Sequence, residues 1–219
     1  RDLAGALRTK VIQHHAAITD PDEIGKLMIA IHGYSGSPVI KAALAFSALV
    51  FQRPGEIRHM RWEEVNWDDA CWEIPARKRK LPWEHIVPLS GQSMQVLEAL
   101  YERTGKSVYV FPSARGRRRP LSENGVRTAL RSMGYGNESM TPHGFRAMAR
   151  IILDEVLGFR VDWIECQLAH AAKDPNGRPY DPNANLEGRR QMMQGWADYL
   201  DHLRDVSLGL VHYRVRPKC

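Results

Sequence analysis

A change of hydrophobic period constrains the fold of this chain more than any other feature of its sequence. Through most of the 219 residues, apolar side chains recur at the three- and four-residue intervals of a helix. Over Val65–Pro75 the pattern switches to the two-residue period of a strand, with a turn at Asp68 and Asp69, and His85–Leu89 follows as a third short strand. The sequence therefore predicts a mostly α-helical α+β domain with a small three-stranded antiparallel sheet.

Helical spacing covers both sides of this predicted sheet. The stretch Val39–Phe51 is so strongly apolar that we expect a buried helix there. Residues 171–185 are rich in Ala, Asp, Pro, Asn and Gly, which predicts a loop, whereas Arg115–Pro120 is expected to form a basic turn. Ser122 is expected to cap the helix that follows it. The expected helices are residues 20–33, 39–51, 54–62, 92–103, 122–133, 144–157, 161–170 and 186–203.

The charge balance bears on the kind of partner. The 31 Lys and Arg residues against 25 Asp and Glu give a net charge of +6, which favours a polyanion such as nucleic acid. From charge alone, a basic protein that binds no nucleic acid is about equally compatible with the sequence. The three cysteines are far apart and form no Cys-x-x-Cys pair, which argues against a disulfide framework or a structural zinc site. We therefore expect a reducing compartment, and no apolar run approaches the ~20 residues of a membrane helix.

Basic residues are the candidates for chemistry on a phosphate, because the chain has neither a Gly-rich phosphate loop nor a cluster of acidic metal ligands. Arg53 stands directly before the helix start at Pro54, where free N–H groups favour an anion. Glu56 lies one turn into that helix and could orient a neighbour. His143 and Arg146 share a helix face, so imidazole and guanidinium point at one spot. Taken alone, each motif also fits an ordinary helix start.

Two further motifs lie in expected loops. A Lys at the tip of the loop between the second and third strands could place an ammonium in a DNA groove or at a leaving oxygen. Tyr180 follows His170 by ten residues, in a loop that would leave it exposed and movable enough to act as a nucleophile. The ordinary alternative for the basic loop is a run of solvated charges, and for His170 it is a surface histidine without a catalytic role. The first basic loop holds Arg77, Lys78, Arg79 and Lys80, and a second holds Arg115, Arg117, Arg118 and Arg119 as candidate phosphate contacts.

The order of these motifs resembles the tyrosine recombinase family. The motifs follow one another as in that family: Arg with Glu, a hairpin Lys, His-x-x-Arg, His and then Tyr. Their amino-acid sequences are most similar to those of the integrases of satellite phages and genomic islands. The resemblance covers nearly the whole chain. It rests on seven blocks in the right order: His14–Asp20, Gly33–Pro38, Arg53–Arg58, His85–Ser90, Thr141–Arg146, Gln167–His170 and Arg189–Leu200.

The resemblance implies a role for each candidate residue. Arg53 and Arg146 would grip the scissile phosphate, while His143 and His170 would hydrogen-bond it and assist proton transfer. A hairpin lysine would protonate the leaving 5′ oxygen; Lys80 is the first choice and Lys78 the competing one. Glu56 would support the site, and Tyr180 would be the nucleophile that forms a 3′-phosphotyrosine. Such an enzyme cuts and rejoins DNA without metal, cofactor or ATP, to integrate or excise a prophage or genomic island.

The resemblance also implies an organisation and partners. Residues 1–219 would be the single catalytic domain of an integrase, with 1–18 as linker from a missing N-terminal core-binding domain and 205–219 as a C-terminal tail. The partner would be double-stranded DNA at attachment sites, bound weakly by this chain alone. A monomer would form a homotetramer on DNA, together with accessory DNA-bending or directionality proteins. The expected location is the bacterial cytoplasm, at the nucleoid and not at a membrane.

Two departures from the family pattern bear on the site. Phe51 and Gln52 precede Arg53 where many recombinases have Thr-Gly, and Pro179 and Pro182 exclude a regular helix around Tyr180. The sequence leaves other interpretations open. A type IB topoisomerase uses similar Arg, Lys, His and Tyr chemistry, a relic of an integrase would bind DNA without cutting it, and an unrelated basic helical protein would match only by coincidence.

Overall fold

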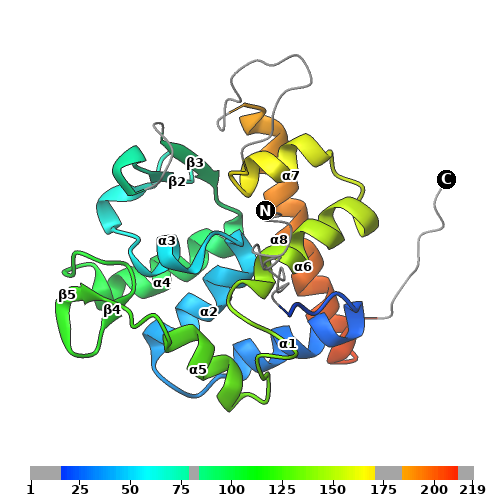
Figure 1. The fold of residues 1–219 in the computed structure, drawn as a ribbon, viewed down its shortest axis with the longest axis horizontal. Coiled ribbons are helices and arrows are strands. Elements are labelled where there is room, and N and C mark those ends of the chain that lie inside the picture. The colour runs from blue at the N-terminus through cyan, green and yellow to red at the C-terminus, as the bar shows by residue number, and fades with distance from the viewer. Residues whose placement is uncertain (1–15, 79–83, 171–183, 212–219) are drawn as a thin grey trace, which may run out of the picture.

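The computed structural model describes residues 16–78, 84–170 and 184–211, and in these ranges helices predominate (Figure 1). The α-helices are α1 (Pro21–Gly33), α2 (Pro38–Val50), α3 (Pro54–Arg58), α4 (Gly91–Thr104), α5 (Gly125–Ser132), α6 (Gly144–Ile151), α7 (Val161–Gln167) and α8 (Leu186–Ser207). Short 3₁₀ turns occupy Trp62–Glu64 and Ala76–Lys78, and a π-helical turn occupies Ile152–Val156. The prediction of a mostly helical α+β domain is confirmed. None of the described helices has the length and apolar character needed to cross a membrane.

The predicted three-stranded sheet is present. Its strands β1 (Val65–Asn66), β2 (Cys71–Ile74) and β3 (His85–Pro88) are antiparallel in the order β1-β2-β3, and Trp72 pairs with Val65 on one side and with Val87 on the other. These three side chains are buried and close the sheet over the core.

A second sheet was not predicted. The strands β4 (Pro112–Ser113) and β5 (Gly116–Pro120) form an antiparallel hairpin, so the prediction of a mere basic turn at residues 115–120 is wrong. Arg118 and Arg119 are both exposed although they are adjacent in β5. A ribbon exposed to solvent on both faces needs no alternation of apolar and polar residues, so the pattern gave no sign of it.

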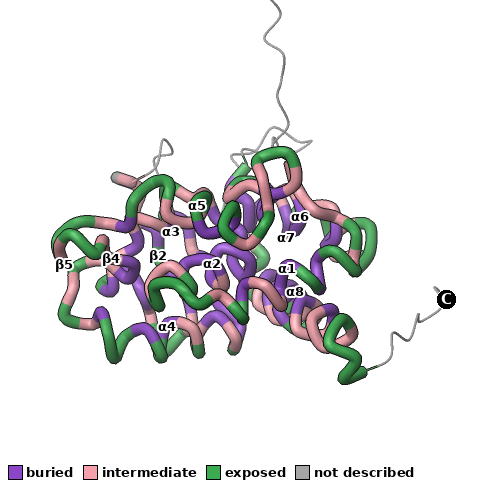
Figure 2. The backbone as a smooth tube through the Cα atoms, turned by 90° about the horizontal axis from the view of Figure 1, so that it is seen from below, coloured by how far each residue is buried: buried purple, intermediate pink, exposed green. Residues whose placement is uncertain are grey.

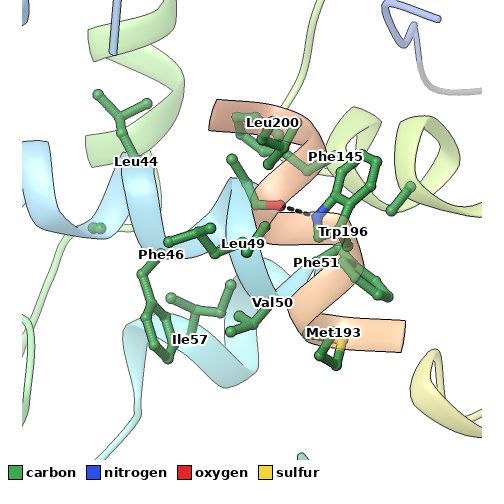
Figure 3. Close-up of a cluster of buried hydrophobic side chains, with 14 of the residues drawn as sticks. Leu44, Phe46, Leu49, Val50, Phe51, Ile57, Phe145, Met193, Trp196 and Leu200 are labelled. Carbon is green, nitrogen blue, oxygen red and sulfur yellow. Dashed lines mark hydrogen bonds between the residues drawn. The ribbon is translucent and has the colours of Figure 1, made fainter. Parts of the chain in front are cut away.

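Helix α2 lies at the centre of the molecule. It contacts α1, α3, α4, α5 and α8, and Figure 2 shows it within the buried interior. Seven of its residues are buried, and Leu44, Phe46 and Val50 are completely buried, as expected from its apolar composition. Figure 3 shows how Trp196 of α8 packs beside α2 and donates its Nε1–H to the carbonyl oxygen of Ala48, 2.9 Å away. The buried C-terminal half of α2 thus links the sheet, through the contact of Phe46 with Trp72, to the C-terminal helix.

Helices α1 and α8 share the most extensive contact between two elements, although they are far apart in the sequence. Gly25 makes it possible: a Cβ there would lie 2.5 Å from the carbonyl oxygen of Leu203, so the helices meet backbone to backbone. Helix α8 runs to Ser207, four residues beyond the predicted end at 203. Residues 205–207 therefore belong to this helix and not to a C-terminal tail.

Other boundaries also differ from the predictions. Helix α5 begins at Gly125 with Asn124 as its N-cap residue, so Ser122 does not cap it. Helix α3 ends at Arg58 and not at residue 62, because the chain turns there into the 3₁₀ segment before β1. Within the predicted linker 1–18, the described residues join the domain. The N–H of Thr141 donates to the carbonyl oxygen of Ala16 at 3.3 Å, and Ile18 packs against the core.

The packing of α8 predicts a contrast between two of its leucines. Leu200 is fully buried, whereas Leu208, which follows the last turn, is 51% exposed. We expect Leu200→Ala to lower the free energy of unfolding by about 2–5 kcal/mol, because it leaves a cavity against α2. Leu208→Ala should change it by less than about 0.5 kcal/mol. Urea denaturation followed by circular dichroism measures both values; equal losses would contradict this packing.

Candidate functional site

The site begins at the junction between α2 and α3. Phe51 ends α2 in the left-handed conformation, with φ 41°, and its N–H donates to the carbonyl oxygen of Ser47 at 3.1 Å. This conformation costs an L-residue about 1–2 kcal/mol. The cost is offset by burial, since the Phe51 ring is fully buried and meets Trp196 edge to face at 6.0 Å. The junction therefore makes its turn at a large buried aromatic residue.

Arg53 occupies the N-cap position of α3, with Pro54 as the first helical residue. Its side chain is 40% exposed and donates from NH1 to Oε1 of Glu56 at 3.3 Å. The other oxygen of Glu56 accepts the backbone N–H of Arg53, also at 3.3 Å. Glu56 therefore holds both the backbone and the guanidinium of Arg53, which agrees with the orienting part expected of it.

Arg146 lies between the C-terminal ends of two helices. From α6 its NH1 donates to the carbonyl oxygen of Phe51 at 3.0 Å, and its NH2 donates to that of Leu168 at 2.8 Å. Phe51 and Leu168 are the C-cap residues of α2 and α7. Carbonyls at helix ends lack partners within the helix and carry partial negative charge, which suits a buried cation. Arg146 thus brings α6, α7 and the Arg53 junction together.

His170 joins this arrangement through a reversal of the chain after α7. Ala169 adopts the left-handed conformation with φ 51°, and the N–H of His170 donates to the carbonyl oxygen of Glu165 at 3.1 Å. The N–H of Ala169 donates to the carbonyl oxygen of Cys166 at 2.9 Å, which completes a Schellman motif. Arg146 NH2 lies 3.2 Å from Nε2 of His170. Of the predicted site residues, the structure therefore gathers Arg53, Glu56, Arg146 and His170 around one junction.

Glu165 contacts this cluster but was not predicted. Its Oε2 lies 2.6 Å from Nδ1 of His170, and its Oε1 accepts from Nε of Arg150 at 3.1 Å. Arg150 NH1 in turn lies 3.6 Å from Asp154. A spacing of five residues between Glu165 and His170 is not a helix-face spacing, so the sequence pattern gave no reason to pair them.

His143 lies at the N-cap position of α6 and is exposed. It lines a hollow of about 890 Å³ together with Pro54 and Gly55 at the start of α3. Arg58 and Arg127 lie on the wall of the same hollow, and the sequence analysis named neither. The hollow therefore lies beside the Arg53 junction, and both arginines and the carboxylates of Glu123 and Glu138 border it.

The structure separates the two candidate lysines. Lys78 forms an ion pair with Glu64 and donates from Nζ to the carbonyl oxygen of His59 at 2.6 Å; its side chain is 18% exposed. In this structure the ammonium of Lys78 is therefore occupied by partners within the domain, and its predicted part in DNA contact or proton donation stays a prediction. Lys80 and Arg79 fall within residues 79–83, and Tyr180 within 171–183, both outside the described residues.

The other basic residues predicted to contact DNA are dispersed. Arg115, Arg118 and Arg119 are exposed on the β4–β5 hairpin, which lies at the edge of the molecule and away from α6 and α7 (Figure 1). The backbone of Arg77 lies in a 3₁₀ turn and that of Arg117 in β5. The structure thus keeps Arg115, Arg118 and Arg119 away from the Arg146 cluster.

A buried polar group behind the site was also missed. Gln167, fully buried at the end of α7, accepts two hydrogen bonds on Oε1 from Arg189 of α8, at 3.2 and 2.8 Å. Arg189, also fully buried, donates to the carbonyl oxygen of Ile86 in β3 at 2.5 Å. The backbone oxygen of Gln167 accepts from Gln52 at 2.6 Å, directly before Arg53. This polar group connects strand β3, helices α7 and α8, and the α2–α3 junction.

Comparison with known proteins gives one family. The model of the phage integrase family matches residues 18–175. The integrase of Enterobacteria phage P4 is 36% identical, over 96% of this chain and 51% of the relative. Prophage integrase IntA of Escherichia coli K12 is 34% identical, over 88% of this chain and 46% of the relative. The chain therefore spans about half the length of the curated relatives it matches.

Solved structures agree on the fold. The integrase from mycobacterium phage Brujita has a TM-score of 0.63 at 14% identity, covering 90% of this chain and 64% of that one. The catalytic core of lambda integrase has a TM-score of 0.54 at 20% identity, covering 77% of this chain and 98% of that one. At these identities the likeness establishes the fold of a tyrosine recombinase catalytic domain, as predicted.

The buried polar group predicts unequal roles for two adjacent arginines. Arg189→Ala leaves Oε1 of Gln167 and the carbonyl oxygen of Ile86 buried without this donor, so we expect a loss of about 3 kcal/mol of stability. Arg190 donates to the exposed carbonyl of Asp69. Arg190→Ala should lower the free energy of unfolding by less than about 1 kcal/mol, because water can replace this donor. Thermal and urea unfolding of both variants measure these losses of stability. A larger loss for Arg190→Ala than for Arg189→Ala would contradict this network.

Proposed function

The chain belongs to the phage integrase family, and on this premise we propose that it is the catalytic domain of a site-specific tyrosine recombinase. Its substrate would be double-stranded DNA at attachment sites, and its reaction the integration or excision of a prophage or genomic island. The observation that carries the proposal is the meeting of Arg146 with the Arg53 junction and with His170. Residues scattered through the sequence thus converge on the junction between α2 and α3.

We assign the steps as follows. Arg53 and Arg146 bind the nonbridging oxygens of the scissile phosphate, and His143 and His170 assist proton transfer and donate hydrogen bonds to it when their rings are protonated. The hydroxyl oxygen of Tyr180 attacks phosphorus and passes its proton to Nε2 of His170, and the bond to the 5′ oxygen breaks as Lys80 supplies that oxygen with a proton. Glu56 positions Arg53 throughout. The phosphodiester energy is kept in the 3′-phosphotyrosine, so attack by a 5′ hydroxyl reseals the strand.

The cations of the proposed site compensate for the low fraction of ionised tyrosine at neutral pH. An ordinary tyrosine has a pKa of about 10, so roughly one in a thousand is ionised at pH 7, a penalty of about 4 kcal/mol. Cationic neighbours favour the phenolate, and in phosphoryl transfer a single Arg is worth about 10³–10⁵ in rate. Two arginines and a lysine therefore supply the positive charge that the proposed reaction needs.

The proposed assembly goes beyond one chain. We propose that this chain alone is a monomer that binds DNA weakly, in the bacterial cytoplasm at the nucleoid, and that four copies assemble on paired sites with accessory DNA-bending or directionality proteins. Lambda integrase, similar in fold at 19% identity and TM-scores of 0.57 and 0.56, has been solved as a dimer bound to a core site and as a tetramer bound to a Holliday junction. The exposed arginines of the β4–β5 hairpin would contact phosphates of the flanking duplex.

A covalent-capture experiment tests the proposed function. A library of nicked duplexes with a randomised central segment, which lose the 5′ strand once cut, traps any covalent intermediate. We expect wild-type protein to retain a subset of sequences through denaturant, and Tyr180→Phe to retain none. An adduct with Tyr180→Phe would overturn the nucleophile. An absence of adduct with wild type would favour a DNA-binding relic, and relaxation of any supercoiled plasmid without site preference would favour a topoisomerase.

The assignment of the general acid has its own test. Replacing the bridging 5′ oxygen of a selected duplex by sulfur gives a leaving group that needs no proton donor. Lys80→Ala should therefore lose cleavage of the oxygen substrate by about 10²–10⁴-fold and regain it with the sulfur substrate. Lys78→Ala should instead cost about 3–5 kcal/mol of stability, since it strands the buried carboxylate of Glu64. Sulfur rescue of Lys78→Ala and not of Lys80→Ala would reverse the assignment.

A further inference from the structure

We propose that Glu165 is a positioning residue that fixes His170 in one tautomer and one orientation beside Arg146. The inference concerns residues that the structure describes, and only its catalytic consequence rests on the proposed function. The hydrogen bond between Oε2 of Glu165 and Nδ1 of His170, at 2.6 Å, is among the shortest contacts of the site.

The two neighbours of the imidazole decide where its proton lies. A guanidinium can only donate, so Nε2 of His170, 3.2 Å from NH2 of Arg146, accepts that hydrogen bond. The proton of a neutral ring then lies on Nδ1 and points at the carboxylate of Glu165, which can only accept while ionised. Both contacts require the same tautomer, and Nε2 is the nitrogen that faces the phosphate-binding arginine.

Glu165 is itself held in place. Its Oε1 accepts from Nε of Arg150 at 3.1 Å, and Arg150 reaches Asp154 in the π-helical turn. Arg150 lies one helical turn after Arg146 on α6, so the same helix supports both sides of His170. The side chain of Glu165 is 19% exposed, against 47% for His170, so the carboxylate lies behind the ring and not in front of it.

The backbone makes this pairing possible. On a regular helix, residues five apart point in different directions, because each residue advances by about 100°. The left-handed conformation of Ala169 reverses the chain after α7, so that the imidazole of His170 returns to the carboxylate of Glu165. The Schellman motif and the side-chain hydrogen bond thus fix the same residue from two directions.

The arrangement has a chemical consequence at the proposed site. When a phosphate gripped by Arg146 arrives, Nε2 is already aimed at it and can accept a proton or, once the ring is protonated, donate one to a phosphoryl oxygen. The carboxylate of Glu165 offsets the charge of the imidazolium, as an orienting acid does for the histidine of a catalytic triad. Loss of Glu165 should therefore slow the reaction without removing a group that touches DNA.

The ring nitrogens provide a direct test that needs no DNA. With ¹⁵N-labelled histidine at pH 8, long-range proton–nitrogen spectra distinguish the two neutral tautomers, and His170→Gln assigns the ring among the nine histidines. We expect His170 to carry its proton on Nδ1 in wild type and to become a mixture of tautomers in Glu165→Ala. Glu155→Ala is the matched control, because Glu155 is an exposed carboxylate of the π-helical turn and should leave the spectrum unchanged. A wild-type ring protonated on Nε2, or an unchanged ring in Glu165→Ala, overturns the proposal.

A kinetic test follows for the reaction itself. On a duplex selected by covalent capture, Glu165→Ala should form the adduct about 10–100-fold more slowly than wild type at unchanged DNA affinity, and Glu155→Ala at the wild-type rate. A wild-type rate for Glu165→Ala would overturn the catalytic consequence. Failure of the wild type to form any adduct would instead overturn the proposed function, while the tautomer in the spectra still decides the role of Glu165.

Discussion

A buried guanidinium needs acceptors, and the way Arg146 finds them determines how the site is built. Its hydrogen bonds end on the C-cap carbonyls of Phe51 and Leu168, which no residue within α2 or α7 satisfies in the normal helical manner. The cation and the helix ends therefore stabilise each other, and three helices are held in one relation. Arg53 and His170 lie within two residues of these carbonyls in the sequence, so their positions follow from the same bonds. An arginine assigned to phosphate binding is thus also a structural element of the site.

The sequence predicted the site better where neighbours in the chain act together. The helix start at Arg53 and Pro54, its support by Glu56, and the three-stranded sheet all depend on local pattern, and the structure has them as expected. The central place of α2 followed from an apolar composition that only a buried helix tolerates. The order of the motifs led to the family, which the comparisons confirm.

Contacts between distant segments could not be predicted in this way. Arg189 and Gln167 are 22 residues apart, and each looks in the sequence like an ordinary polar residue of a helix surface. The pairing of Glu165 with His170 depends on the left-handed Ala169, and alanine gives no signal of that conformation. In the sequence Lys78 looked like the other basic residues of its loop, and only the fold shows its ion pair with Glu64. The β4–β5 hairpin was missed because both of its faces are polar.

The contact between α1 and α8 has a consequence for the order of events during protein synthesis. The face that α1 buries is covered only once residues 186–207 have been made, and Arg189 in the same helix completes the polar group behind Arg53. A nascent chain on the ribosome therefore carries its arginines long before the helix that braces them. The polar group behind Arg53 can therefore be completed only after α8 has emerged from the ribosome, so this support of the site is among the last parts of the fold to form.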